Sequence, residues 1–485
     1  MSETAPSPHV RSAPATLAVL AALAVAIGAV ESLPLPALPL IQRELELTPA
    51  QAGLLSTTLL LAGSVTVPIT AKFADAFGGR RVLLALVWCI VAGGAVSAFA
   101  GSLPVMLTGQ FLQGLGAGII PVAFVVLREL FPQRMSASVG MVMGCFTVGS
   151  GAGVLIAGPL ADTLSRRWMF LLPTLLVTAL AVIAYFMLPH GTTPRKRPAA
   201  RTDWLGGLLL AATLGTLMFN LSKIPENGWL SATTWGLLTL TVVFGTAWVL
   251  VERRAEDPVV NLRMLGRRGV WSSSAVAGVL GAGYAVPYFL IPQLLALPAE
   301  ATGFGFGASA SDISLYLFPA VVVAVVVGPA AGALVRRVGP RAVVVGGLIV
   351  TASGLLFALR WHSSPWHIVL VLLLTVGVGV GAASTALYIG VIESVEAADT
   401  GVATAIGGVA RGVGAAIGVQ IAAAIITTSA SPTTHLPTEG GFESGFLLST
   451  ALVLLPLVIV RFLPGRASQT ASPARDEGAT GAALR

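Results

Sequence analysis

Charged residues are scarce in this chain, and their scarcity excludes a water-soluble fold. Only 10% of the 485 residues are Asp, Glu, Lys or Arg, whereas 55% are apolar. Such a chain has too few polar side chains to cover the surface of a soluble domain, so we expect it to lie in a lipid bilayer. The net charge of +7 does not indicate a nucleic-acid partner, because the basic residues fall in short turns without interleaved aromatic residues.

Cysteine and histidine are also rare, which argues against metal chemistry. Cys89 and Cys145 each lie in an apolar run without a neighbouring Cys or His. The sequence contains neither the G-x-x-x-x-G-K-[ST] pattern of nucleotide-binding loops nor the H-E-x-x-H zinc pattern. We therefore expect no metal, no cofactor and no enzymatic activity. A membrane enzyme would need clustered acids or histidines at lipid depth, and a sensor or scaffold would need an output domain.

Long apolar runs are what the chain has in abundance, and about 20 apolar residues suffice for one membrane crossing. They predict an all-α integral membrane protein with 14 transmembrane helices. The predicted divisions are a cytoplasmic tail (1–14), a first six-helix bundle (15–188), basic linkers with two additional helices near 204–222 and 234–251 (189–269), a second six-helix bundle (270–462) and a disordered cytoplasmic tail (463–485).

The distribution of basic residues predicts the orientation. Most of the 28 lysines and arginines fall in turns on the same side as both termini. Positive residues are retained on the cytoplasmic side of a membrane. We therefore expect both termini in the cytoplasm of a bacterium with this chain in its cell (inner) membrane.

Two stretches of the sequence indicate an internal duplication. Residues 68–82 (PITAKFADAFGGRRV) and 329–343 (PAAGALVRRVGPRAV) share a proline, a small residue, a charge, a glycine and an arginine at equal offsets. Duplicated hydrophobic halves are typical of transporters that hold their substrate between two helix bundles.

The first of these stretches resembles the loop between spans two and three of the major facilitator superfamily, within it the fourteen-span drug:proton antiporters. Asp75, Gly78, Arg80 and Arg81 stand in register with the loop pattern of that family. The resemblance implies a latch, in which Asp75 meets a helix N-terminus of the opposite bundle, here near residues 399–401. A solvated turn charge is the alternative interpretation of Asp75. The resemblance covers nearly the whole chain and implies two pseudo-symmetric bundles.

The fourth and fifth spans carry altered versions of the family motifs. In span four, Gln113 and Gly114 match, but Gln110 replaces an arginine that the family is thought to use in proton coupling. In span five, Gly149, Gly153 and Gly158 match the family motif. Pro159 directly follows the last matching glycine, whereas the proline of the motif stands earlier. The altered motifs therefore favour neither proton-coupled nor proton-independent transport.

Two ionisable residues lie within predicted spans. Glu31 occupies the place of the family's aspartate in span one, before Pro34, Pro36 and Pro39, which should bend the helix. Arg411 lies in span thirteen. We interpret both as proton-coupling candidates, although each could instead extend to the membrane surface. By analogy with the family's architecture, Tyr284, Tyr288 and Gln293 of span nine are candidate substrate-lining residues, with interface anchoring as the alternative for the tyrosines.

These observations favour a secondary-active exporter of small hydrophobic compounds, such as an antibiotic, drug or secondary metabolite. The expected mechanism is alternating access, with protons moving inward, and the expected assembly is a monomer. The alternative is a proton-independent facilitator or an importer of a small organic solute, which Gln110 and the altered fifth-span motif motivate.

Overall fold

The computed structural model describes residues 8–130, 135–188, 204–255, 258, 260, 262–395, 400–432, 434 and 436–463. Within these ranges it describes the side chains of all residues except 8–14, 68, 71–72, 75–76, 128–130, 135–137, 204 and 400–401.

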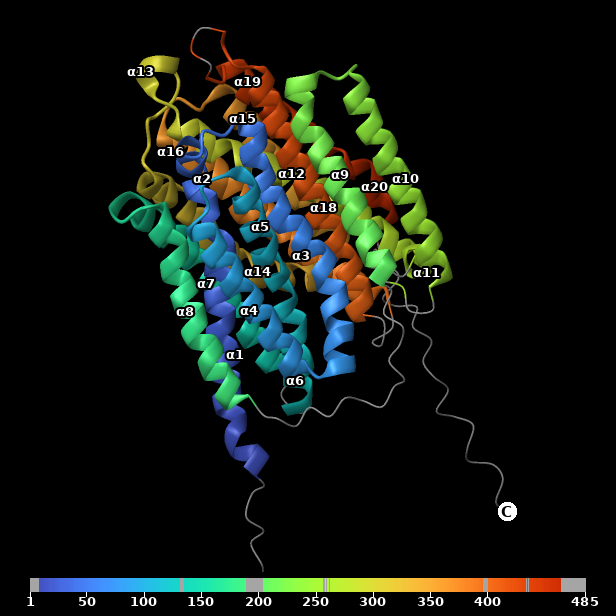
Figure 1. The fold of residues 1–485 in the computed structure, drawn as a ribbon. Helices are drawn as coiled ribbons and strands as arrows, with labels where there is room; N and C mark the ends of the chain where they lie inside the picture. Colours follow the sequence, from blue (N-terminus) through green and yellow to red (C-terminus); the bar gives the residue numbers. More distant parts are fainter. Residues whose placement is uncertain are drawn as a thin grey trace, which may run out of the picture.

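Helices make up almost all of the described chain (Figure 1). The first six spans are built from α1 (Pro8–Ser32), α2 (Pro34–Glu44), α3 (Pro49–Phe77), α4 (Gly79–Ala98), α5 (Leu103–Gly114), η1 (Leu115–Gly118), α6 (Ile119–Leu130), α7 (Met135–Thr163) and α8 (Arg166–Met187). The two additional spans are α9 (Trp204–Asn227) and α10 (Ala232–Arg254), followed by the short α11 (Leu262–Leu265).

The last six spans follow the same up-and-down course. They are built from α12 (Arg268–Ala296), α14 (Ala310–Val338), α15 (Pro340–Arg360), α16 (Pro365–Leu372), η3 (Leu373–Val380), α17 (Gly381–Glu393), α18 (Thr400–Thr428), α19 (Glu439–Leu454), α20 (Pro456–Ile459) and η4 (Val460–Phe462), with the short α13 (Ala299–Thr302) after α12. In the part of the chain that is described, fourteen helical segments are long and apolar enough to cross a membrane, as predicted.

Capping side chains explain where two of the long helices begin. The Thr48 hydroxyl accepts a hydrogen bond from the Gln51 amide while the Gln51 side chain accepts one from the Thr48 amide. Ser309 and Asp312 form the same reciprocal arrangement at α14. Such boxes satisfy backbone donors that an apolar environment would otherwise leave unpaired.

The duplicated stretches adopt the same backbone turn. Gly78 separates α3 from α4 with φ +91°, and Gly339 separates α14 from α15 with φ +86°. Side chains with a Cβ atom rarely adopt these angles. The sequence repeat is therefore a repeat of structure, because both turns require glycine at the same offset.

The two six-helix bundles meet chiefly along two helix pairs, and α2 adds contacts with α12 and α14. Helix α3 packs against α18, and α7 packs against α14. We name the two ends of the molecule after two short helices: the α13 end lies at the top of Figure 1, and the α11 end is the opposite end, where α11 and α6 lie.

The additional helices α9 and α10 form a hairpin at one edge of the molecule (Figure 1, green). Helix α9 packs on both α3 and α18, and α10 packs on α9. The Thr241 hydroxyl donates to that of Thr216 at 3.1 Å and joins the hairpin. Much of α10 is exposed through apolar side chains such as Trp235, Val242 and Leu250, which suits contact with lipid.

Candidate transport site

Glu31 lies where the first span is interrupted. Helix α1 ends at Ser32 and α2 begins at Pro34, so the proline-rich stretch breaks the helix directly beyond Glu31. Proline removes a backbone donor and clashes with the preceding turn, which explains the break. The Glu31 side chain is half-buried, one residue before the end of α1. A carboxyl inside a membrane span can exchange a proton only where water reaches it.

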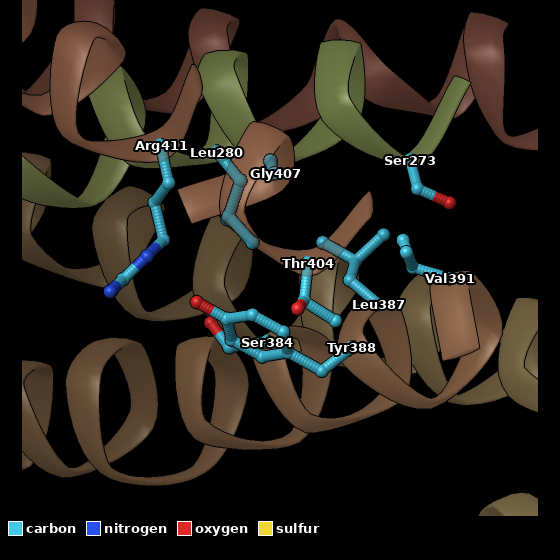
Figure 2. Close-up of a pocket in the computed structure, with 10 residues that line it drawn as sticks. Ser273, Leu280, Ser384, Leu387, Tyr388, Val391, Thr404, Gly407 and Arg411 are labelled. Carbon is cyan, nitrogen blue, oxygen red and sulfur yellow. The ribbon is translucent and has the colours of Figure 1, made fainter. Parts of the chain in front are cut away.

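A cleft opens between α12, α17 and α18 in the second bundle (Figure 2). It encloses about 360 Å³, including the open space at its mouth. The lining residues are Ser273, Ala277, Leu280, Ser384, Leu387, Tyr388, Val391, Thr404, Gly407 and Arg411. Apolar walls with a few polar groups are typical of small-molecule sites.

Arg411 is the charged group of this cleft. Its guanidinium lies near the hydroxyls of Tyr284 and Tyr388. Its Nε atom is buried without a hydrogen-bond partner. The Tyr284 and Tyr288 rings are in edge contact, with centroids 6.4 Å apart, so the two tyrosines and Arg411 form one cluster. Within the described residues, no interaction links Arg411 to Glu31.

A set of hydrogen bonds joins the two bundles near the α13 end, and we call it the gate. Each bond links a residue of the first bundle with one of the second. The pairs are Gln42–Gln293 (2.8 Å), Asp162–Ser311 amide (2.7 Å), Gly158 amide–Ser314 (2.9 Å), Ala50 amide–Thr427 (3.0 Å) and Ala50 carbonyl–Gln420 (3.1 Å). These hydrogen bonds hold the two bundles together at the α13 end.

The three candidate substrate-lining residues of span nine therefore lie in two different places. Tyr284 lies beside Arg411, and Tyr288 contacts the Tyr284 ring, but neither tyrosine is among the described lining residues of the cleft. Gln293 is buried at the α13 end, where its Nε2 donates to Oε1 of Gln42 in the gate. The sequence distance of nine residues between Tyr284 and Gln293 corresponds to about 13 Å along a helix, which is why one helix reaches both places.

The latch expected at the α11 end falls mostly outside the described part of the chain. The Asp75 side chain, residues 396–399 and the side chains of Thr400 and Gly401 are not among the described groups. Arg80 donates from Nη2 to the Tyr185 carbonyl at 2.5 Å and lies over the Tyr185 ring. Arg81 is exposed at the start of α4. Arg80 thus ties the start of α4 to the end of α8 within the first bundle.

The span-four glutamines are both buried. Gln110 is 1% exposed, and Gln113 donates from Nε2 to the Ser97 hydroxyl at 2.9 Å. A Cβ atom on Gly114 would lie 2.6 Å from the Leu59 carbonyl oxygen, so this motif packs α5 closely on α3. Gln110 therefore lies inside the first bundle without introducing a charge there.

The span-five glycines bring α7 against two different neighbours. A Cβ atom on Gly149 would lie 2.0 Å from the Val25 carbonyl oxygen, and one on Gly153 would lie 2.4 Å from that of Ala29, both in α1. A Cβ atom on Gly158 would lie 2.1 Å from the Ala310 carbonyl oxygen, in α14. Pro159 lies inside α7. The motif therefore serves packing within the first bundle and contact between the bundles.

Two polar residues at the α13 end were not singled out from the sequence. Asp162 ends α7 and lies against the N-terminus of α14. Arg166 is buried and donates to Oε2 of Glu44 at 2.7 Å and to the carbonyls of Ser97 and Ala100. The position of Asp162 and Arg166 next to apolar spans could have indicated a role for them. Their hydrogen-bond partners lie far away in the sequence, so the sequence alone could not identify these contacts.

A separate cluster joins α15 to α19 at the α13 end. His362 lies 2.8 Å from the Glu439 carboxylate through Nε2 and 2.9 Å from the Ala358 carbonyl through Nδ1. Glu443 lies close to both, because one ligand atom from each of the three residues falls within 4.8 Å of the others. This cluster belongs to the second bundle alone and lies away from the cleft.

Comparison with known proteins agrees with this architecture. The family model described as Major Facilitator Superfamily matches residues 20–296 and 273–484, which together cover most of the chain. The chain therefore belongs to the Major Facilitator Superfamily, and its fourteen described helical segments that could cross a membrane agree with this family.

Individual relatives differ in the function that their names state. A multidrug resistance protein B homolog from Mycobacterium tuberculosis is 28% identical over 310 residues, which are 62% of this chain and 54% of that protein. A uridine/deoxyuridine transporter from Lactococcus lactis is 26% identical over 371 residues, 73% of this chain and 75% of that protein. The chain thus matches about half the length of the first relative and three quarters of the second.

The nucleoside transporter NupG has the same fold. Its crystal structure aligns with a TM-score of 0.64 at 12% identity, over 93% of this chain and 98% of that one. At this identity the likeness concerns the fold alone.

Proposed function

We propose that this transporter exports small hydrophobic compounds by alternating access, in exchange for protons. The gate carries the proposal. With the basic turns at the α11 end in the cytoplasm, the gate is the outer closure, and the cleft lies nearer the inner side. In this state a solute enters from the cytoplasm. Opening the gate while the inner end closes would release it outside.

The relatives support export without excluding import. The multidrug resistance protein B homolog favours an efflux pump, and the uridine/deoxyuridine transporter favours a nucleoside carrier. The cleft, with its apolar walls, suits a hydrophobic compound better than a sugar-bearing nucleoside, whose several hydroxyls would need partners. Import of a small organic solute, or proton-independent facilitation, is the second candidate.

Glu31 is the proposed proton carrier. It is a half-buried carboxyl in the first bundle, and Gln110 places no charge where the family has its arginine. A carboxyl inside a membrane span can bind and release a proton where water reaches it. Asp75 remains our proposed latch at the cytoplasmic end, and Asp75→Ala should slow turnover without weakening solute binding.

Accumulation in intact cells tests the direction of transport. A host without its own drug pumps, expressing the full chain, should accumulate less of at least one lipophilic antibiotic or dye from a broad panel than the empty host does. Collapse of the proton gradient should abolish the difference. Raised uptake of radiolabelled uridine, with no compound of the panel exported, would instead establish the importer.

A further inference from the structure

We propose that Arg411 anchors an acidic group of the transported solute, so that the cleft selects amphipathic organic anions. This inference rests on the proposed function and concerns the solute that the same site takes. The anchor would hold a carboxylate, sulfonate or phosphate, and the apolar walls would hold the body of the compound.

The charge of the cleft is one-sided. Its described lining residues include one cation, Arg411, and no carboxylate (Figure 2). No described acid lies within ion-pair distance of Arg411, and the groups beside its guanidinium are the hydroxyls of Tyr284 and Tyr388. Phenol oxygens accept hydrogen bonds but carry no neutralising charge. A cation in such surroundings is stabilised by an anion, whereas an amine would be repelled.

The guanidinium retains unused donor capacity. Its Nε atom is buried without a hydrogen-bond partner. Arginine presents its donors in a planar fork that matches the two oxygens of a carboxylate or the oxygens of a phosphate. An acidic group would therefore find both the charge and the donor that the protein leaves unsatisfied.

A second unsatisfied donor lies in the same cleft. Ser273 lines the cleft from α12, is 1% exposed, and its hydroxyl has no hydrogen-bond partner. Buried hydroxyls without partners are costly and uncommon in folded proteins. A polar substituent on a solute held by Arg411 would supply one.

The walls between these donors define the body of the solute. Ala277, Leu280, Leu387 and Val391 are apolar and line the cleft. Gly407 lines the cleft one turn before Arg411, and a Cβ atom there would meet nothing within 4 Å. We therefore expect the apolar body of the solute to lie beside Gly407.

A matched set of ligands tests the anchor directly. The purified full chain in lipid nanodiscs is titrated calorimetrically with 1-naphthoate, 1-naphthamide and 1-naphthylmethylamine, which share one aromatic body and differ in charge. Empty nanodiscs correct for partition into lipid. We expect 1-naphthoate to bind at least tenfold more tightly than the other two. Equal or tighter binding of the amine, or no binding of 1-naphthoate, would overturn the proposal.

Variants separate the charge from the shape of the cleft. Arg411→Gln should lose at least tenfold in 1-naphthoate affinity and leave the amide unchanged. Gly407→Val should weaken 1-naphthoate by filling the space without altering charge, whereas Gly408→Val on the next residue, which does not line the cleft, should not. Retained 1-naphthoate affinity in Arg411→Gln would refute the anchor, and retained affinity in Gly407→Val would refute the assignment of the solute to this cleft. If Arg411→Gln fails to fold, the three-ligand series in the unaltered chain tests the charge preference, and the Gly407 and Gly408 pair tests whether the compound lies in the cleft.

This test is independent of the transport direction. Binding in nanodiscs needs neither a gradient nor two compartments. Selective binding of 1-naphthoate without any export in cells would contradict only the proposed function, and export without anion selectivity would contradict only the anchor.

Discussion

Asp162, at the end of α7, accepts a hydrogen bond of 2.7 Å from the backbone amide of Ser311 in the first turn of α14. A carboxylate of one bundle thus caps a helix N-terminus of the other, where the helix dipole favours negative charge. The same physical arrangement was expected for Asp75 at the opposite end of the molecule. The Asp162 contact should therefore stabilise the state in which the gate is closed.

Asp162→Asn should open the gate more often. The charge at a helix N-terminus contributes about 0.3–1 kcal/mol, so the closed population should fall by up to about fivefold relative to the open one. Cysteines are introduced as Gln42→Cys and Gln293→Cys, and Cys89 and Cys145 are replaced by serine. The measurement is the rate at which a short bifunctional thiol reagent links the two introduced cysteines, and this rate should fall in Asp162→Asn. Asp312→Asn removes a charge from the same helix end but within the second bundle, and should leave the rate unchanged. An unaltered rate in Asp162→Asn would show that Asp162 does not help to keep the gate closed.

Arg166→Ala should destabilise the first bundle. The side chain is buried, and its loss leaves the Ser97 and Ala100 carbonyls without their donor. Hydrogen bonds to charged groups contribute about 1.5–3 kcal/mol each at most, so we expect a loss on the order of 2 kcal/mol and a lower melting temperature in detergent. The exposed neighbour Arg167→Ala is the control. Equal melting temperatures for the two variants would show that Arg166 is dispensable.

Gly158→Ala should disturb the contact between the bundles. Its methyl group would fall 2.1 Å from the Ala310 carbonyl oxygen, which is backbone and must move. We expect transport to fall severalfold while the melting temperature changes little, because the strain falls on the bundle interface. Gly144→Ala in the same helix has open space and should behave as wild type. Normal transport by Gly158→Ala would mean that the interface adapts without loss of function.

Glu31→Gln mimics a permanently protonated carboxyl and should abolish proton-driven transport. In vesicles with an imposed pH gradient, uphill movement of an identified solute should be lost, whereas downhill exchange of that solute should survive. Glu300→Gln, in the exposed α13, serves as the control. Undiminished uphill transport by Glu31→Gln would exclude Glu31 as the carrier.

The orientation can be tested at the tip of the additional hairpin. Leu230→Cys, in the turn between α9 and α10, should react in intact cells with a thiol reagent that cannot cross membranes, because Leu230 is 89% exposed. Arg337→Cys, at the α11 end, should react only after lysis. The opposite pattern of reactivity would show that the orientation is reversed and that the gate faces the cytoplasm.

The sequence by itself determined the class of fold. Apolar runs of sufficient length, the repeated glycine turn at Gly78 and Gly339, and the prolines after Glu31 all act through local rules, since hydropathy, allowed φ angles and missing donors do not depend on distant residues. The spans, the duplication and the helix break followed from them.

Only the tertiary structure decided which polar groups meet. Gln293 joins Gln42 across 251 positions, Ser311 meets Asp162 across 149, and Arg411 is placed between Tyr284 and Tyr388 on two other helices. Close contacts of glycines such as Gly149, Gly153 and Gly414 with neighbouring backbones help to set the rotation and depth of their helices, and these contacts form between segments far apart in the chain. The sequence could therefore name Glu31 and Arg411 as unusual and predict the helix break beyond Glu31, but not that Arg411 lies in a cleft whose described lining holds no acid.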